Sequence, residues 1–452
     1  MSNYTNSSVK HGHLDRINDI SFDSTGRRMA TCSSDMCVKI WKKAAPEAGI
    51  PSNYSMSSPP MSDDDGIMSS TQSGESSADV ESQMVNGAKW INTHKIQAHN
   101  GPVWKVSWAD PHFGQVIATC SFDRKAIVFE ETSADSNSET ATVWTQRNLI
   151  VDCQASVIGV KFGPQREGLI LALASVDGLV QIYQATSPWN LTVWVHHSKI
   201  KHLKSCTLTS ISWSTPITLP TLLAVGANGG TLSEKTERFG LFELIHSANP
   251  ESGKELIWRR IQDSCIEIHA PTAVYEVAFA PSVGRRYHTL AVATNQIRVI
   301  KIELPFASQF QSSANDSTEF NINEAAASKY QFSSQTVVNS GSVSGSLTAD
   351  ICYRLGWNAL GTIFAASQGD GSVKLYKQNH FNQWICFSKL EAKPTSELTS
   401  SRVSRSLFPN NVLNTNSTEP VFGNVDPNKS SQKCSKRPTN VADTNCGVMI
   451  AE

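Results

Sequence analysis

The clearest regularity in the chain is a six-residue pattern of hydrophobic and polar positions: apolar, two variable, apolar, variable, aromatic. A turn region and then an apolar run that opens on alanine follow each copy. Short runs rich in Val and Ile and bounded by turn residues are typical of β-strands rather than helices. The copies are INDISF, VWKVSW, VIGVKF, LTSISW, VYEVAF and CYRLGW, ending at Phe22, Trp108, Phe162, Trp213, Phe279 and Trp357, and the alanines are Ala30, Ala118, Ala172, Ala224, Ala291 and Ala365.

Four of the six repeats continue alike, with an aspartate five residues after the alanine and an aromatic residue six further on. Residues 30–41 (ATCSSDMCVKIW) and 118–129 (ATCSFDRKAIVF) are nearly the same. Strand clusters that return at a core spacing of about forty residues are typical of β-propeller blades. We therefore predict an all-β, six-bladed propeller. The aspartates are Asp35, Asp123, Asp177 and Asp370, and the aromatic residues are Trp41, Phe129, Tyr183 and Tyr376.

Three polar segments interrupt this period. Residues 44–89 are rich in Ser and acidic groups, residues 306–346 are rich in Ser and Asn, and residues 392–452 are polar throughout. Such segments contain too little apolar surface to offset the entropy of ordering. We expect one propeller domain over residues 9–391, flexible insertions at 44–89 and 306–346, and a disordered tail over 392–452.

Charge and cysteine content narrow the function classes. The 39 Lys and Arg nearly balance the 40 Asp and Glu, so there is no basic excess for direct nucleic-acid binding. No apolar run approaches about 18 residues, so we expect no membrane insertion. The start MSNYTNSSVKHGH lacks the apolar region of a secretory signal. Ten scattered cysteines without CxxC pairs then suggest reduced, buried thiols in the cytosol or nucleus.

The residues that could act in catalysis or metal binding fit a structural role better. A His, Ser/Thr and Asp trio could suggest a hydrolase triad, but this trio recurs with the repeat and decays in later copies, as structural bracing would. The histidines of HGH (11–13) and HH (196–197) lack convergent metal-ligand partners, so we expect surface histidines and no metal. GANGGT (226–231) lacks the GK[ST] ending of a phosphate loop. We expect neither an enzyme nor a cofactor.

The repeats resemble WD repeats over roughly residues 9–391. In that family a His, a Ser/Thr, a turn Asp and a Trp form a hydrogen-bonded tetrad that braces each blade. By motif position the resemblance assigns these roles to His13, Thr31, Asp35 and Trp41 in the first repeat. In the second it assigns them to His99, Thr119 and Asp123, with Phe129 in place of Trp. Asp177 and Asp370 take the turn position in the third and sixth repeats.

Three longer runs narrow the resemblance: FDSTGRRMATCSSD (22–35), VWKVSWADPHFGQVIATCSFDR (103–124) and VYEVAFAPSVGRRYHTLAVAT (274–294). They resemble the SEH-type WD-repeat nucleoporins, relatives of the coat protein Sec-thirteen. The resemblance implies a non-enzymatic scaffold in the Y-shaped outer-ring complex of the nuclear pore and in a GATOR complex of TOR signalling. It also implies location at the nuclear envelope and in the nucleus, and through complexes at the lysosomal surface and kinetochore.

The same resemblance implies an open ring that an α-solenoid nucleoporin completes with a blade, alongside other Y-complex nucleoporins and GATOR subunits. The last repeat contains its own outer strand at QWICFSKL (383–390), and little N-terminal sequence is left to close the ring. Exposed strand edges are normally covered, and strand addition by a partner covers them. Two alternatives remain: a vesicle-coat subunit, or an adaptor that binds peptides on the propeller face.

Overall fold

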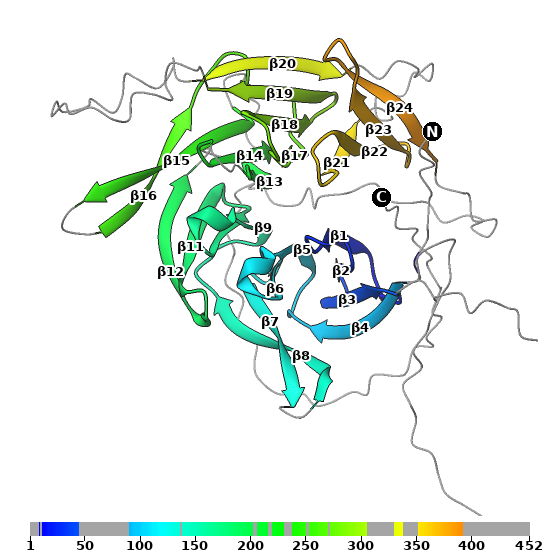
Figure 1. The fold of residues 1–452 in the computed structure, drawn as a ribbon, viewed down its shortest axis with the longest axis vertical. Coiled ribbons are helices and arrows are strands. Elements are labelled where there is room, and N and C mark those ends of the chain that lie inside the picture. Colours follow the sequence, from blue (N-terminus) through cyan, green and yellow to red (C-terminus); the bar gives the residue numbers. More distant parts are fainter. Residues whose placement is uncertain are drawn as a thin grey trace, which may run out of the picture.

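The computed structural model describes residues 9, 11–44, 90–135, 138–201, 206–215, 219–229, 237–249, 253–269, 272–304, 330–337 and 351–391. These residues form six four-stranded antiparallel sheets arranged around a common centre, so the predicted six-bladed propeller is confirmed (Figure 1). In the described part of the chain, no helix is long and apolar enough to cross a membrane.

The first three blades follow one another along the chain, each running from the centre outward. Blade 1 consists of β1 (Ile17–Phe22), β2 (Arg28–Ser33), β3 (Cys37–Lys43) and β4 (Trp90–Gln97). Blade 2 consists of β5 (Val103–Trp108), β6 (Val116–Ser121), β7 (Ala126–Asp135) and β8 (Ser138–Ile150), with the 3-10 helix η1 (Pro111–Phe113). Blade 3 consists of β9 (Val157–Phe162), β10 (Ile170–Ser175), β11 (Leu179–Ser187) and β12 (Asn190–Lys201), with η2 (Gln165–Glu167).

The remaining blades repeat this order. Blade 4 consists of β13 (Thr207–Trp213), β14 (Leu222–Asn228), β15 (Phe239–Asn249) and β16 (Gly253–Ile261). Blade 5 consists of β17 (Glu276–Phe279), β18 (Tyr287–Ala293), β19 (Ile297–Glu303) and β20 (Gln331–Val337). Blade 6 consists of β21 (Cys352–Trp357), β22 (Ile363–Gln368), β23 (Val373–Gln378) and β24 (Trp384–Leu390), so the outer strand expected at QWICFSKL is confirmed.

One boundary needs correction. Residues 331–337 fall inside the predicted flexible insertion 306–346, yet they form β20, which pairs with β19 along its whole length. Phe332 packs against the core between blades 4 and 5 and Val337 is buried in the core between blades 5 and 6, so apolar residues on both faces fix this strand despite its serines. The predicted segments 45–89, 306–329, 338–346 and 392–452 lie outside the described residues.

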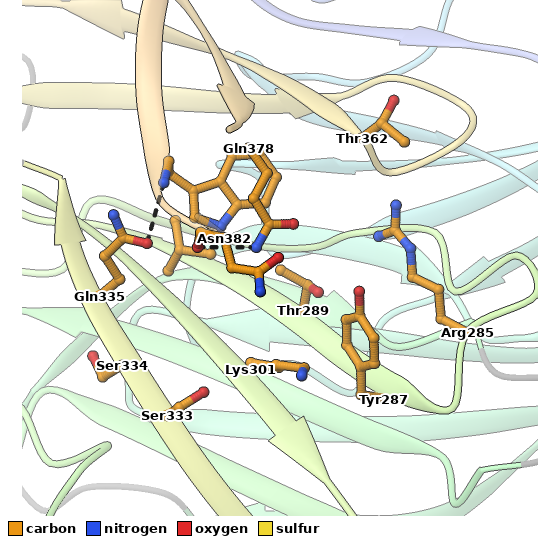
Figure 2. A pocket seen from close by; sticks show the side chains of 12 residues that line it. Arg285, Tyr287, Thr289, Lys301, Ser333, Ser334, Gln335, Thr362, Gln378 and Asn382 are labelled. Carbon is orange, nitrogen blue, oxygen red and sulfur yellow. Dashed lines mark hydrogen bonds between the residues drawn. The ribbon is translucent and has the colours of Figure 1, made fainter. Parts of the chain in front are cut away.

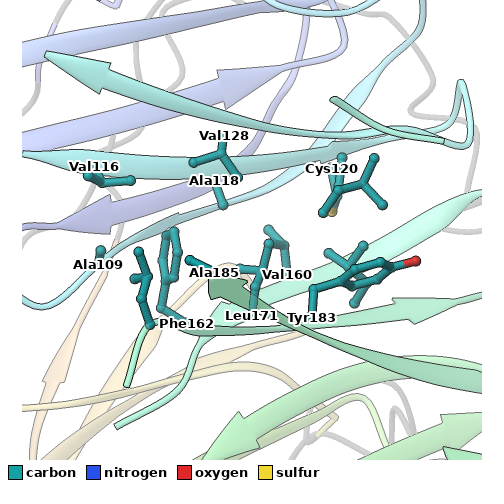
Figure 3. Packing of buried hydrophobic residues seen from close by; sticks show 14 of the residues in the cluster. Ala109, Val116, Ala118, Cys120, Val128, Val160, Phe162, Leu171, Tyr183 and Ala185 are labelled. Atoms are coloured by element: carbon teal, nitrogen blue, oxygen red, sulfur yellow. The ribbon is translucent and has the colours of Figure 1, made fainter. Parts of the chain in front are cut away.

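The core of the molecule lies between blades rather than within them. Between blades 2 and 3, for example, Ala118 and Val128 meet Val160 and Leu171, all at most 1% exposed (Figure 3). The β-branched and small residues of the repeat therefore bury both faces of a middle strand. Six of the eight described cysteines are buried, and the exceptions, Cys265 and Cys386, are exposed.

Candidate partner-binding seam

Hydrophobic clusters join neighbouring blades at five junctions: 1 with 2, 2 with 3, 3 with 4, 4 with 5, and 5 with 6. Within the described residues, no such cluster joins blade 6 to blade 1. In Figure 1 these two blades face each other on the right of the view, with no described strand between them. We call this junction the seam.

Burial along β22 shows which blade is left uncovered at the seam. The corresponding second strands of blades 1 to 5 are buried at nearly every position, whereas in β22 buried residues alternate with partly exposed ones. Phe364 and Ala366 pack on blade 5, so Ala365 between them faces the seam. A β-strand turns successive side chains to opposite faces, so the alternation indicates one covered and one uncovered face.

Blade 1 closes its own seam-facing side. Met29, Trp41 and Trp90 form a buried cluster there, with Val9 packed against it. The Lys39 ammonium donates to the backbone carbonyl of His11 at 2.9 Å and that of Gly12 at 2.7 Å. The segment before β1 is therefore held against the face of blade 1, and the two sides of the seam differ.

The structure brings His13, Thr31, Asp35 and Trp41 together on this same face. His13 Nδ1 lies 2.9 Å from Asp35 Oδ2, and His13 Nε2 lies 2.9 Å from Thr31 Oγ1. Trp41 Nε1 donates to Thr31 Oγ1 at 3.0 Å. Since the carboxylate only accepts, Nδ1 carries the proton and Nε2 accepts from the Thr31 hydroxyl. Both ring nitrogens of His13, the Thr31 hydroxyl and the Trp41 indole nitrogen are thus hydrogen-bonded.

Protonation states follow from burial and these contacts. Burial lowers the pKa of His13 from its ordinary 6.5, although Asp35 acts in the opposite direction. Burial would raise the pKa of the Asp35 carboxyl, but hydrogen bonds from His13 and from the backbone N–H groups of Leu14 and Cys37 outweigh it and lower the pKa. A neutral imidazole and an ionised carboxylate fit the direction of the hydrogen-bond chain.

The second repeat has three of the four tetrad groups, a His, a Thr and an Asp, but no Trp. His99 contacts Asp123 at 3.0 Å and Thr119 Oγ1 at 2.9 Å, while buried Phe129 offers no donor. Burial again lowers the pKa of the histidine. Asp177 instead accepts hydrogen bonds from its near neighbours, the Ser175 hydroxyl and the Leu179 N–H.

In the sixth repeat Asp370 accepts from the backbone and hydroxyl of Ser372, at 2.8 and 2.6 Å. The aspartates of the third and sixth repeats therefore stabilise their own turns. Among the described residues, neither aspartate forms a hydrogen bond with a histidine. That any of these groups braces its blade remains a prediction.

A network of charged residues ties the inner strands together across the ring. Lys105 Nζ on β5 lies 3.2 Å from Asp19 on β1 and 3.5 Å from Glu276 on β17. Arg354 on β21 lies 3.5 Å from Glu276 and donates to the Asn18 carbonyl at 3.1 Å. This last contact crosses the seam at its inner end, where polar groups replace the apolar layer found at the other junctions.

Comparison with known proteins agrees with this architecture. The model of the "WD domain, G-beta repeat" family matches residues 5–42 and 90–130, the part of the chain that carries the two histidine-containing repeats. Nucleoporin SEH1 of Danio rerio is 34% identical over 389 residues, which covers 84% of this chain and 85% of that protein. The proteins of the same name from Bos taurus and Homo sapiens are each 32% identical over 381 residues, covering 84% of this chain and 86% of theirs.

The chain belongs to the SEH1 family of nucleoporins. Its recognition as an SEH-type WD-repeat nucleoporin from three sequence runs is thereby confirmed. One smaller expectation about this SEH1-family chain was wrong: His11 and His13 are each only 7% exposed, so they are not surface histidines. The Gly12 backbone, at φ +53°, turns both rings inward beside Lys39.

The sequence analysis did not predict two features of this SEH1-family protein, a charged network and a set of aromatic pairs. The third position of the six-residue pattern holds Asp19, Lys105, Glu276 and Arg354 in four blades, and these alternating charges could have signalled the axial network. Outer strands also carry an aromatic residue that meets the aromatic end of the inner strand, as Trp144 meets Trp108 at 5.7 Å. The number of residues between the inner and outer strands differs from blade to blade, so these aromatic pairs do not appear as a repeat in the sequence.

Proposed function

We propose that this chain is a non-enzymatic scaffold subunit of the Y-shaped outer-ring complex of the nuclear pore, located at the nuclear envelope. In this proposal an α-solenoid nucleoporin inserts polypeptide at the seam and covers the open face of blade 6. The single observation that carries it is the alternating burial of β22, seen in no other second strand of the described blades.

The exposed chemistry at the seam suits strand addition. On β24, which pairs with β23, Ile385 is 41% exposed, and Ala365 on β22 is partly exposed. An inserted extended segment would place alternate apolar side chains on this face. The backbone of β22 is already paired with β21 and β23, so main-chain hydrogen bonds could form only along the outer edge of β24. Packing of apolar side chains on the uncovered face therefore supplies much of the affinity in this proposal.

The proposal extends to other assemblies that present a comparable solenoid. GATOR subunits and the remaining Y-complex nucleoporins are the partners implied by the family resemblance, and through them the lysosomal surface and the kinetochore. One seam can hold only one such segment at a time. The pore and GATOR pools of this protein are therefore expected to be mutually exclusive.

Affinity purification of the tagged full-length chain from its native cells tests the proposal. The wild type should retain an α-solenoid nucleoporin and stain the nuclear rim. Ala365→Glu, which places a charge on the uncovered face, should lose that partner. Val195→Glu is the matched control, since Val195 is half exposed on the outer strand of blade 3, away from the seam.

Two results would contradict the proposal. Retention of the solenoid by Ala365→Glu at wild-type level would show that binding does not use this face. A folded wild-type protein that purifies alone would contradict the scaffold function, and a protein that concentrates at endoplasmic-reticulum exit sites rather than the nuclear rim would favour the vesicle-coat alternative.

A further inference from the structure

A cavity of about 490 Å³ lies between blades 5 and 6, away from the seam (Figure 2). Strands β18 to β20 supply one wall, and the ends of β22 to β24 supply the other. The residues that line it are polar for the most part and include two cations, Arg285 and Lys301, but no Asp or Glu. Figure 2 shows Tyr287 and Thr289 beside these cations and Gln378 across from them.

The corresponding place between blades 1 and 2 is filled by the protein itself. There the Arg28 guanidinium lies over the Trp108 and Trp144 rings, with its central carbon 5.4 and 5.6 Å from their centroids. Its Nη2 donates to Glu131 at 2.8 Å and its Nη1 to Gln115 at 3.0 Å. A paired, charge-assisted contact of this kind is among the stronger polar interactions in proteins.

Strand register shows that blade 6 keeps this site but lacks its carboxylate. Counting from Ala118 in blade 2 and Ala365 in blade 6, the residues that correspond to Gln115, Glu131 and Trp144 are Thr362, Gln378 and Trp384. All three line the cavity.

The opposite wall has changed as well. Thr289 pairs with Lys301 as Arg28 pairs with Lys42, so a short side chain stands in blade 5 where blade 1 has arginine. The cavity is therefore the volume that an arginine–glutamate pair fills at the other junction.

The two cations at this cavity retain unused donors. Arg285 uses Nη1 for the Gly361 carbonyl at 2.8 Å and Nη2 for the Leu360 carbonyl at 3.2 Å, which holds the side chain in place. Lys301 pairs with Glu303 at 2.6 Å and lies 4.4 Å from the centroid of the Tyr287 ring. A guanidinium has five N–H donors and an ammonium three, so each can also bind an anion.

We propose that this cavity binds an anionic side chain of a peptide, with the ligand carboxylate or phosphate taking the role that Glu131 plays between blades 1 and 2. Exposed apolar residues near the lining residues in the sequence favour a peptide over a free ion: Val283, Leu360 and Phe381 are 57%, 61% and 70% exposed and lie within two residues of Arg285, Thr362 and Asn382. Apolar residues flanking the anionic one would rest on these exposed residues. The site is independent of the seam and does not require the proposed scaffold function.

Fluorescence anisotropy with the full-length protein tests the inference, using labelled peptides that carry aspartate, phosphoserine or asparagine between leucines. The anionic peptides should bind and the asparagine peptide should bind at least about tenfold more weakly. The aspartate and phosphoserine arms show which anion the site prefers. Equal binding of all three peptides, or of none, would overturn the inference.

Variants of the cavity locate the binding. Thr289→Arg with Gln378→Glu should rebuild the internal pair, fill the cavity and reduce binding at least about tenfold. Lys301→Gln, on an exposed side chain, should weaken binding in the same direction without filling the cavity, and it keeps the test sound if the double variant does not fold. Arg147→Gln removes a partly exposed cation from blade 2 and should leave binding unchanged. Wild-type affinity in both cavity variants would place the binding elsewhere and contradict the proposal.

Discussion

At the scale of single residues, the first repeat shows what a complete hydrogen-bond chain requires. Trp41 is 4% exposed and its indole N–H ends on Thr31. We predict that Trp41→Phe lowers the free energy of unfolding by about 1 kcal/mol, since the ring is nearly retained and one buried hydrogen bond is lost. Urea denaturation measures this.

A tryptophan without such a bond provides the comparison. The indole nitrogen of Trp104 is buried but makes no hydrogen bond. Trp104→Phe should therefore cost less than Trp41→Phe. If the two substitutions cost the same, the tetrad would not act as a brace.

His288 makes a prediction about pH. It is 1% exposed, its Nε2–H donates to the Pro220 carbonyl at 3.1 Å, and burial lowers its pKa from 6.5 to about 4. Because the folded pKa lies below the unfolded one, the unfolded chain takes up the proton first as pH falls. The stability present above pH 6.5 is then lost toward pH 4, by about 2 kcal/mol at pH 5.

His288→Gln should remove this part of the pH dependence. Unfolding curves of the wild type and the variant at pH 7.5 and pH 5 give the comparison, in which other titrating groups cancel. An equal loss of stability in both proteins would show that His288 does not stay neutral in the fold.

At the scale of elements, two alanines at the same position of their repeats test whether the face of blade 6 toward the seam is uncovered. Ala172 and Ala365 hold the same place in their repeats, but Ala172 is fully buried and Ala365 is not. Ala172→Glu should destabilise the protein by more than about 3 kcal/mol or prevent folding, because it buries a charge without a partner. Ala365→Glu should cost less than about 1 kcal/mol in the isolated protein, measured by thermal unfolding, and a cost as large as that of Ala172→Glu would show that the face is covered.

The sequence predicted the inner elements better than the outer ones, for physical reasons. Inner and middle strands pack on both neighbours, so their side chains repeat as a readable pattern, as in 30–41 and 118–129. In outer strands such as β20 only some side chains are covered: Phe332 and Val337 pack against neighbouring blades, and the serines between them are exposed. A strand of this composition is indistinguishable from a polar insertion until its partner strand is known.

At the scale of the whole molecule, the charged network joins inner strands of different blades across the centre of the ring. The side chains of Lys105, Asp19 and Glu276 are 11–15% exposed. We predict that Lys105→Met lowers the free energy of unfolding by about 2 kcal/mol, since it leaves two poorly solvated carboxylates without their shared cation. The double variant Lys105→Met with Asp19→Asn should recover part of this loss in urea denaturation, and a further loss would contradict the network.

The sequence indicated an open ring and placed charges at one position of the repeat, but it did not show which residues meet across the ring. These contacts depend on which blades meet: Asn18 and Arg354 are far apart in the chain and touch only because the last blade returns to the first. Motif position could group His13, Thr31, Asp35 and Trp41, which contact one another, because all of them belong to one repeat. Contacts within a repeat are indicated by its spacing, whereas the partners of a contact between the first and last repeats are not.

A structure of the native complex, purified through this chain and determined by cryo-electron microscopy, tests the central claim most directly. We expect strands of another polypeptide against the open face of blade 6, between β21–β24 and β1–β4. A map in which blade 1 packs on blade 6 without an inserted segment, or in which the partner binds only elsewhere on the propeller, would contradict it.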